Sequence, residues 1–293
     1  MRLTKFTAAF AGVVLAGSLA ACGGDDSSSE PEVVTDAEFE AGTTMAELKE
    51  AGTMTVGTKF DQPGFGLLGL EDTPEGFDVE VAKIIAGAMG IAPEDIEWKQ
   101  ASSDIREQVI EDGEVDMVVA TYTINEERAE RITFAGPYYE AGQMLMVNAD
   151  NDSIEGPEDI ADNPDMKVCS VTGSTPSEQI REYLASDDQL VLFDIYDKCK
   201  DALGNGQVDI VTTDNVILLG YVDESDGEFK LVGEQFTEEP YGIGIEKGDT
   251  EFCEFINQTL QDNEEAYLAA WESTAGEVEG TETPELPEPA PCA

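Results

Sequence analysis

The chain has no histidine among its 293 residues, and its 15 basic residues are far outnumbered by 64 acidic ones. Without histidine it can build no His-based catalytic triad and no His metal site, although carboxylate catalysis stays possible. The formal net charge of −49 would repel polyanions and so excludes nucleic acid as a partner. Because 41% of the residues are apolar, the chain can still bury a full core, and its acidic residues belong to the surface.

Such an acidic surface favours an environment of high salt. Strong salt would screen the repulsion among the acidic side chains. We therefore expect a protein from an acidic proteome, adapted to high salt, that loses stability when salt is removed.

Apolar segments long enough to cross a membrane are also missing after the N-terminus. Arg2 and Lys5 precede a short run of apolar or small residues, 6–19. This arrangement is typical of a signal peptide, expected here at residues 1–21. The Leu-Ala-Ala-Cys sequence that ends at Cys22 resembles the lipobox of bacterial lipoproteins. It implies that Cys22 carries lipid, including palmitate; the alternative is an ordinary signal peptide followed by an unmodified cysteine.

Glycine, aspartate and serine dominate the residues directly after Cys22. Such a composition predicts a flexible tether over residues 22–42. The mature chain is therefore expected on the extracellular face of the cell membrane, anchored by lipid and not crossing the bilayer.

The other four cysteines form two pairs in an oxidising location, and three pairings are open. We favour Cys169 with Cys199, because one falls in a predicted strand and the other on the inner face of the next helix. Closing that loop would stabilise the fold by roughly 3–4 kcal/mol. Cys253 with Cys292 would then hold an acidic, Pro-rich C-terminal tail, residues 276–293. The alternative for each cysteine is a buried free thiol.

Strands and helices alternate along both halves of the chain, which predicts an α/β fold. In the first half a strand at 54–58 is followed by a helix from Asp78, then by a strand at 96–98, a helix at 104–110 and a strand at 116–120. The helix from Asp78 has one apolar face, made by Val81, Ile84, Ile85, Ala88 and Met89. In the second half the strands are expected at 167–171, 191–193 and 208–212, with helices from residue 176 and at 197–203.

A short repeat relates the two halves. Residues 113–120, GEVDMVVA, match residues 206–213, GQVDIVTT, at the same point of each half. Two similar lobes should therefore face each other across a cleft, with ligand at the carboxyl ends of the strands.

The chain is expected to return to the first lobe through a strand at 241–245 and an amphipathic segment at 250–271. Two crossings, near residues 139–146 and 236–241, would form a hinge. Lobe 1 is thus predicted at residues 43–140 plus 241–275, and lobe 2 at residues 141–240.

Several motifs, in this order and spacing, resemble the polar amino-acid-binding proteins of ABC importers, solute-binding family 3. They are VGTKFDQP (56–63), GFDV (76–79), VD (115–116) with TYTINEER (121–128), FAGPY (134–138), VTGSTP (171–176) and VD (208–209) with TD (213–214). The resemblance is closest to actinobacterial glutamate-binding members. It implies a type II periplasmic-binding-protein-like fold, in which two α/β lobes are joined by a two-strand hinge. It also implies a monomer with no cofactor and no catalytic activity, whose partners are a small amino acid and an ABC permease in the membrane.

A buried amino acid needs a partner for each of its charges. The resemblance implies Arg128 for the carboxylate, five residues past Thr123 and on a turn that begins at Asn125, a predicted N-cap. The alternative is a surface ion pair of Arg128 with Glu126, Glu127 or Glu130.

A helix start offers a second half-site for the carboxylate. Thr175 is predicted at N-cap, Pro176 at N1 and Glu178 at N3, which is a capping box. Amides at such a start can bind an anion, and the resemblance gives Ser174 and Thr175 the ligand role. Capping by itself would also explain Thr175.

For the ammonium the resemblance implies Asp214, helped by backbone carbonyls near Ala120 and Thr121. The alternative role of Asp214 is N-cap of the helix that follows it.

The resemblance also suggests which residues cover the rest of the ligand. Phe77 and Phe60 would cover its aliphatic part, although core packing is an alternative for any phenylalanine. Lys59 would suit an acidic side chain, unless it is a solvated lysine, and Thr213 would help to read that side chain. Some relatives have lysine where this chain has Val171. Val171 thus removes one cation and leaves glutamine, aspartate and asparagine as alternatives, while Lys59 and the resemblance to glutamate-binding members favour glutamate.

Two other functional classes remain from the sequence. One is an enzyme on the same fold, such as a periplasmic dehydratase that acts on cyclic amino-acid precursors. The other is a sensory or adhesive lipoprotein that binds an amino acid and signals through a membrane partner.

Overall fold

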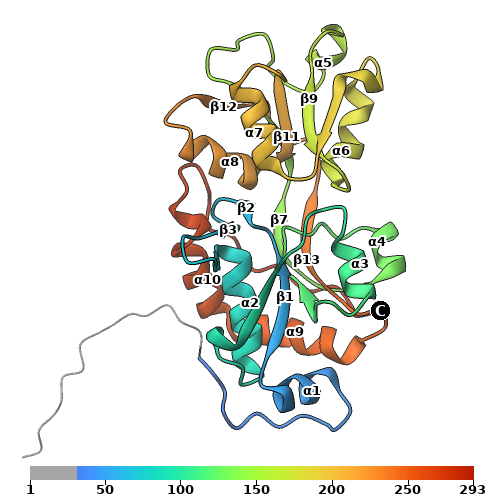
Figure 1. Ribbon diagram of the computed structural model, residues 1–293, viewed down its shortest axis with the longest axis vertical. Coiled ribbons are helices and arrows are strands. Elements are labelled where there is room, and N and C mark those ends of the chain that lie inside the picture. Colours follow the sequence, from blue (N-terminus) through green and yellow to red (C-terminus); the bar gives the residue numbers. More distant parts are fainter. Residues whose placement is uncertain (1–31) are drawn as a thin grey trace, which may run out of the picture.

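The computed structural model describes residues 32–293, so the expected signal peptide and the lipid site at Cys22 lie outside the described residues. The chain forms two lobes, one above the other in Figure 1, each built on a five-stranded sheet. No helix in the range 32–293 is long and apolar enough to cross a membrane. The expected fold of two α/β lobes is confirmed.

Lobe 1 is built on a sheet with the strand order β5-β1-β6-β13-β7. The strands are β1 (Met54–Thr58), β5 (Ile96–Gln100), β6 (Met117–Val118), β7 (Thr133–Ala141) and β13 (Glu239–Ile245). β5, β1 and β6 run parallel, and β13 is antiparallel to β6 and β7. The helices of this lobe are α1 (Thr44–Ala51), α2 (Phe77–Ala88), α3 (Arg106–Glu111), α4 (Glu126–Arg131), α9 (Thr250–Asp262) and α10 (Glu264–Glu272), with 3-10 turns at Pro93–Asp95 and Ala275–Glu277.

A small antiparallel sheet belongs to the same part of the chain. It is made of β2 (Asp61–Gln62), β3 (Gly66–Leu68) and β4 (Pro74–Glu75). This sheet leads the chain from the carboxyl end of β1 to the start of α2.

Lobe 2 is built on a sheet with the strand order β10-β9-β11-β8-β12. The strands are β8 (Gln143–Asn148), β9 (Val168–Val171), β10 (Leu190–Phe193), β11 (Ile210–Asp214) and β12 (Phe229–Val232). The helices are α5 (Asp159–Asp162), α6 (Thr175–Gln179), α7 (Tyr196–Gly204) and α8 (Asn215–Glu224), with 3-10 turns at Ile180–Tyr183 and Asp187–Gln189.

The sequence repeat has the same structural role in both lobes. Gly113 and Gly206 end a helix with φ of 65° and 67°, in the left-handed region that favours glycine. The aspartate three residues later then accepts a backbone N–H from the start of the neighbouring parallel strand. Asp116 accepts from Thr55 at 2.7 Å, and Asp209 accepts from Lys167 at 2.8 Å. The repeat therefore marks equivalent corners of two sheets with the same pattern of parallel and antiparallel strands.

Two antiparallel strands join the lobes (Figure 1). β7 ends at Ala141, two residues before β8 begins, and β13 begins at Glu239, which pairs with Ala141. The chain crosses between the lobes at these two places only within the described range, which is the geometry of a hinge.

The largest core cluster lies in lobe 1 and is rich in aromatic rings. Phe65 and Phe77 each pack edge-on against Trp271, with ring centroids 6.1 and 5.1 Å apart. Phe77 is fully buried and also contacts Tyr267. The amphipathic segment predicted at 250–271 forms α9 and α10, which break at Asn263 and cover this core.

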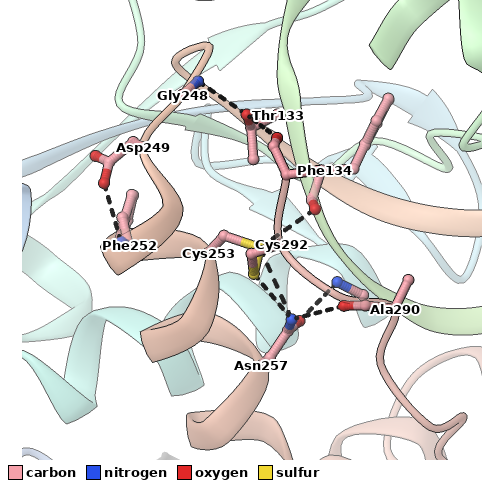
Figure 2. The surroundings of a disulfide bond; sticks show 11 residues. Thr133, Phe134, Gly248, Asp249, Phe252, Cys253, Asn257, Ala290 and Cys292 are labelled. Atoms are coloured by element: carbon pink, nitrogen blue, oxygen red, sulfur yellow. Dashed lines mark hydrogen bonds between the residues drawn. A yellow bond between two sulfur atoms is a disulfide. The ribbon is translucent and has the colours of Figure 1, made fainter.

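Both expected disulfides are present, Cys169–Cys199 and Cys253–Cys292. The second attaches the C-terminal tail to α9, as Figure 2 shows. Beside it, the side chain of Asn257 accepts a hydrogen bond from Gly136 N–H at 2.7 Å, and Ala290 N–H donates to the Gly136 carbonyl at 2.7 Å. The tail is thus fastened to lobe 1 by covalent and backbone contacts.

Candidate functional site

A small cavity lies between the two lobes, at the carboxyl ends of their central strands. We call it the inner cavity; it is lined by Gln62, Ser103, Arg106, Thr121, Thr123, Ser174, Thr175, Pro176, Tyr196, Thr213, Asp214 and Ile217. The space open to the centre of a water molecule is about 10 Å³, enough for about one water. The lobes are therefore closed, and an amino acid can enter only when they separate.

Arg106 is the cation that lines the inner cavity. It lies at the start of α3 and is only 2% exposed. Its Nη1 donates to the carbonyls of Ala120 and Thr121 at 3.0 and 3.2 Å, and its guanidinium lies 4.1 Å from the centre of the Tyr122 ring. Its Nε has no hydrogen-bond partner within residues 32–293. A buried guanidinium with a free donor is suited to an anion.

A strained turn lies next to Arg106. Thr121 has φ of 43°, unusual for a β-branched residue. Its N–H donates to Asp78 at 2.8 Å and its hydroxyl donates to Gln62 at 2.9 Å. Asp78, in the first turn of α2, also accepts the Tyr138 hydroxyl, and burial raises its pKa to about 7. The buried carboxyl therefore holds the turn that gives Arg106 its carbonyl partners.

Asp214 is the acid that lines the inner cavity. It is the last residue of β11 and the N-cap of α8, yet its side chain makes no capping hydrogen bond. One of its oxygens accepts the Tyr241 hydroxyl at 2.7 Å, and the other has no partner in the part of the chain that the structure describes. Burial, followed by the nearby charge of Glu239, raises the pKa of Asp214 to about 7. A free, buried carboxylate oxygen is suited to an ammonium group.

Lys59 reaches the inner cavity through Ser103. Its side chain is buried, and its Nζ donates to the Ser103 hydroxyl at 2.8 Å. Burial and the charge of Arg106 lower the pKa of Lys59 to about 7, against the attraction of Asp61. Lys59 is therefore no solvated lysine, and its charge responds to pH near neutrality.

Arg128 lies at the outer edge of the site. It lines a larger pocket of about 510 Å³, which shares Ser103, Ser174 and Thr175 with the inner cavity. Its guanidinium donates to the carbonyls of Thr123 at 2.6 Å and Gly173 at 2.9 Å, so it joins the two lobes. Its ion-pair partner is Glu107, at 3.3 Å. Burial, followed by the charge of Arg106, lowers the pKa of Arg128 to about 10, which leaves it charged at neutral pH.

The start of α6 lies one residue earlier than the sequence predicted. Ser174, and not Thr175, is the N-cap, and its hydroxyl accepts the Ser177 N–H at 3.1 Å. The predicted capping box is wrong because the Thr175 hydroxyl points towards the hinge, where it donates to Glu239. Glu178 pairs with Arg181 on the surface. Asn125, in contrast, caps α4 as predicted and accepts the Arg128 N–H.

The remaining predicted residues are divided between the site and the core. Thr121, Thr123, Ser174, Thr175, Thr213 and Asp214 line the inner cavity. The carbonyl of Ala120 accepts from Arg106, so it helps to hold that guanidinium. Phe77 belongs to the aromatic core of lobe 1, and half-buried Phe60 is not among the lining residues. The structure therefore brings neither phenylalanine to the inner cavity.

The inner cavity is also lined by four residues that were not predicted from the sequence: Gln62, Ser103, Arg106 and Tyr196. For Arg106 a signal was available, because it lies on the predicted helix 104–110 at the spacing that places it beside Val109 and Ile110. A rare arginine on the apolar side of a helix requires a buried partner. For Gln62 and Tyr196 no comparable signal exists, since the end of β2 and the start of α7 meet only in the folded chain.

Within residues 32–293 no three acidic or cysteine side chains are grouped in a way that would hold a metal ion.

The chain is similar to known proteins over most of its length. A family model described as bacterial extracellular solute-binding proteins, family 3, matches residues 54–269. The glutamate-binding protein GluB of Corynebacterium efficiens is 41% identical over 268 residues, or 88% of this chain and 85% of that protein. The glutamine-binding protein GlnH of an ABC transporter of Bacillus subtilis is 36% identical, over 83% of this chain and 86% of that protein.

A similar solved structure is that of an ancestral arginine-binding protein bound to glutamine. It is 37% identical, with a TM-score of 0.70, and the match covers 76% of this chain and 97% of that one. The tail after residue 276 lies beyond the family match.

Proposed function

The chain belongs to the bacterial extracellular solute-binding proteins of family 3, and from this premise we propose that it receives L-glutamate for an ABC importer. The observation that carries the proposal is the set of buried charges at the inner cavity. One acid, Asp214, and one cation, Arg106, each present an unpartnered polar atom among the described residues. Lys59 lies behind Ser103, and Arg128 lies at the outer edge.

The α-amino acid part of the ligand needs one anion and one cation. Asp214 would take the ammonium group with its free oxygen. Arg128 would take the α-carboxylate, helped by the amides at the start of α6 (Ser174 and Thr175), since two of the five guanidinium N–H groups of Arg128 remain after its three contacts. Arg128 belongs to lobe 1, and Ser174, Thr175 and Asp214 belong to lobe 2. The contacts with the ligand are therefore complete only when the lobes close.

A second cationic corner distinguishes glutamate from other amino acids. Arg106 and Lys59 converge on the side of the cavity that contains Ser103. Two buried cations there would suit a side-chain carboxylate better than an amide, because an amide leaves their charge uncompensated. This argument, together with the similarity to a relative named as a glutamate-binding protein, supports the choice of glutamate over glutamine, aspartate and asparagine.

This role implies how the protein is exported, anchored and brought to its permease. Residues 1–21 would direct export, lipid on Cys22 would hold the chain at the outer face of the membrane, and the closed lobes would present a joint surface to the permease. The ligand would be released unchanged, so the protein is no enzyme.

Calorimetric titration with each of the twenty amino acids tests the proposal. We expect one-to-one binding of L-glutamate, lost in Asp214→Asn and Arg106→Ala and retained in Arg181→Ala, which removes a surface arginine paired with Glu178 and Asp187. Binding of glutamine at equal or greater strength would overturn the choice of ligand. If none of the twenty amino acids binds, or if the protein converts an amino-acid precursor, the proposed function as a receptor would be wrong.

A further inference from the structure

Glu239 is a fully buried carboxylate at the hinge that the ligand site does not require. It is the first residue of β13, where the chain returns to lobe 1. Its Oε2 accepts the hydroxyls of Thr123 and Thr175, both at 2.7 Å, and its Oε1 accepts the Thr237 hydroxyl at 3.1 Å. One oxygen therefore receives two hydroxyl donors from different parts of the chain.

The two donors belong to different lobes. Thr123 lies between β6 and α4 of lobe 1, and its segment is fixed to β13 by Ile124 N–H on the Pro240 carbonyl at 2.8 Å and by Gly242 N–H on the Tyr122 carbonyl at 2.9 Å. Thr175 is the first residue of α6 in lobe 2. Glu239 and Thr123 thus move as one body with lobe 1, and Thr175 can meet them only when lobe 2 closes.

We propose that Glu239 is an interlobe latch, a positioning residue that stabilises the closed form through its contacts with Thr123 and Thr175. Hydrogen bonds to a carboxylate are about twice as strong as those between neutral groups, so the charge of Glu239 matters as well as its shape. The latch acts between the lobes themselves and goes beyond the proposed choice of glutamate.

Closure can be followed at a single amide. Tyr196 N–H, at the start of α7 in lobe 2, donates to Asp61 of lobe 1 at 2.7 Å. Opening the lobes removes this acceptor and exposes the amide to water. Its hydrogen exchange, measured with no amino acid added, therefore reports how often the lobes part.

Glu239→Gln is the primary test, in the full chain. The side chain keeps its shape and loses its charge, and we expect the Tyr196 amide to exchange on the order of tenfold faster, the effect of weakening two charge-assisted hydrogen bonds. The sheet amides of Val56 and Leu145 should keep their rates, since the lobes stay folded. Glu238→Gln is the matched control, because Glu238 is exposed, directly precedes β13 and loses the same charge.

Equal exchange in the Glu239→Gln and Glu238→Gln variants would overturn the latch. Equal acceleration of the Tyr196, Val56 and Leu145 amides would also overturn it, because Glu239 would then stabilise the whole fold and not the closed form.

A second pair of variants, at Thr175, tests the latch independently if Glu239→Gln does not fold. Thr175→Val removes only the donor from lobe 2 and should accelerate exchange at Tyr196, whereas Thr175→Ser retains the hydroxyl and should restore protection. Identical rates in these two variants would contradict the latch. None of these measurements uses glutamate, so they stand apart from the titration that tests the proposed ligand.

Discussion

At the scale of the residue, the site depends on buried charges whose pKa values have moved towards neutrality. Burial raises the pKa of Asp214 to about 7 and lowers that of Lys59 to about 7. Each group would be needed in its charged form, Asp214 for the ammonium and Lys59 for a side-chain carboxylate. Asp214 is charged above its pKa and Lys59 below its pKa, so both are charged together only near pH 7.

We therefore predict that the affinity for L-glutamate is greatest near pH 7. Below that pH Asp214 takes up a proton and loses its attraction for the ammonium; above it Lys59 loses its proton and its attraction for the side chain. Each limb should fall by up to about tenfold per pH unit. Calorimetry from pH 5.5 to 8.5 measures the profile.

Two comparisons isolate the alkaline limb. L-Glutamine has a neutral side chain and should retain only the acidic limb, and Lys59→Met should remove the alkaline limb for glutamate. If glutamate and glutamine show the same dependence of affinity on pH, Lys59 does not bind the side-chain carboxylate of the ligand.

At the scale of the element, the paired corners of the two sheets are the clearest product of the sequence repeat. Asp116 and Asp209 each accept a backbone N–H at the start of the neighbouring strand. Asp116 is half-buried and Asp209 is exposed. Leaving a buried backbone N–H without an acceptor lowers the stability of the fold, whereas an exposed N–H can donate to water instead.

Asp116→Ala is expected to lower the free energy of unfolding by about 1–3 kcal/mol, and Asp209→Ala by less than about 1 kcal/mol. Urea denaturation measures both. Asp112→Ala, in an exposed turn nearby, is the control and should change stability by less than about 0.5 kcal/mol. A loss in Asp116→Ala no greater than in the control would mean that the corner contact contributes nothing.

At the scale of the whole molecule, two features act on the entire fold: the disulfides and the surface charge. Cys253 and Cys292 are 39 residues apart, and their bond fastens a tail that lies beyond the family match. The net charge of −49 is spread over a chain with few cations to balance it.

Replacing both Cys253 and Cys292 by serine should lower the free energy of unfolding by about 4 kcal/mol, because the unfolded chain regains the entropy of a long loop. The Cys169 and Cys199 double replacement is the matched comparison, with a separation of 30 residues and a similar expected loss. Guanidinium denaturation measures both. No loss from the Cys253 and Cys292 replacement would indicate that the tail is held by its other contacts alone.

Salt should raise the melting temperature, because screening weakens the repulsion among the 64 acidic side chains. Thermal melts in potassium chloride from 0.1 to 2 M measure the effect. Glycine betaine at equal osmolality is the control for effects unrelated to charge. A melting temperature indifferent to salt would contradict the expected adaptation.

The sequence by itself determined the features that depend on order along the chain. Alternating strands and helices, the repeat at Gly113 and Gly206, and the cysteine pairs could all be predicted, because periodicity, turn residues and loop closure act locally or between marked positions. The repeat also indicated the position of Asp214, directly after residues 206–213, whereas its ligand role came from the resemblance to the family.

Only the tertiary structure decided which side chains meet between the lobes. Phe77 follows a glycine in a recognised motif, yet its ring turns into the core of lobe 1, whereas Arg106 turns to the cavity and Glu239 joins Thr123 and Thr175. The spacing along the chain puts Arg106 on the apolar side of its helix, but it does not indicate that Arg106 reaches the cavity or that Glu239 meets Thr123 and Thr175. Their direction depends on helix phase, strand register and the closure of two lobes around a hinge, and these are set by packing across the whole molecule.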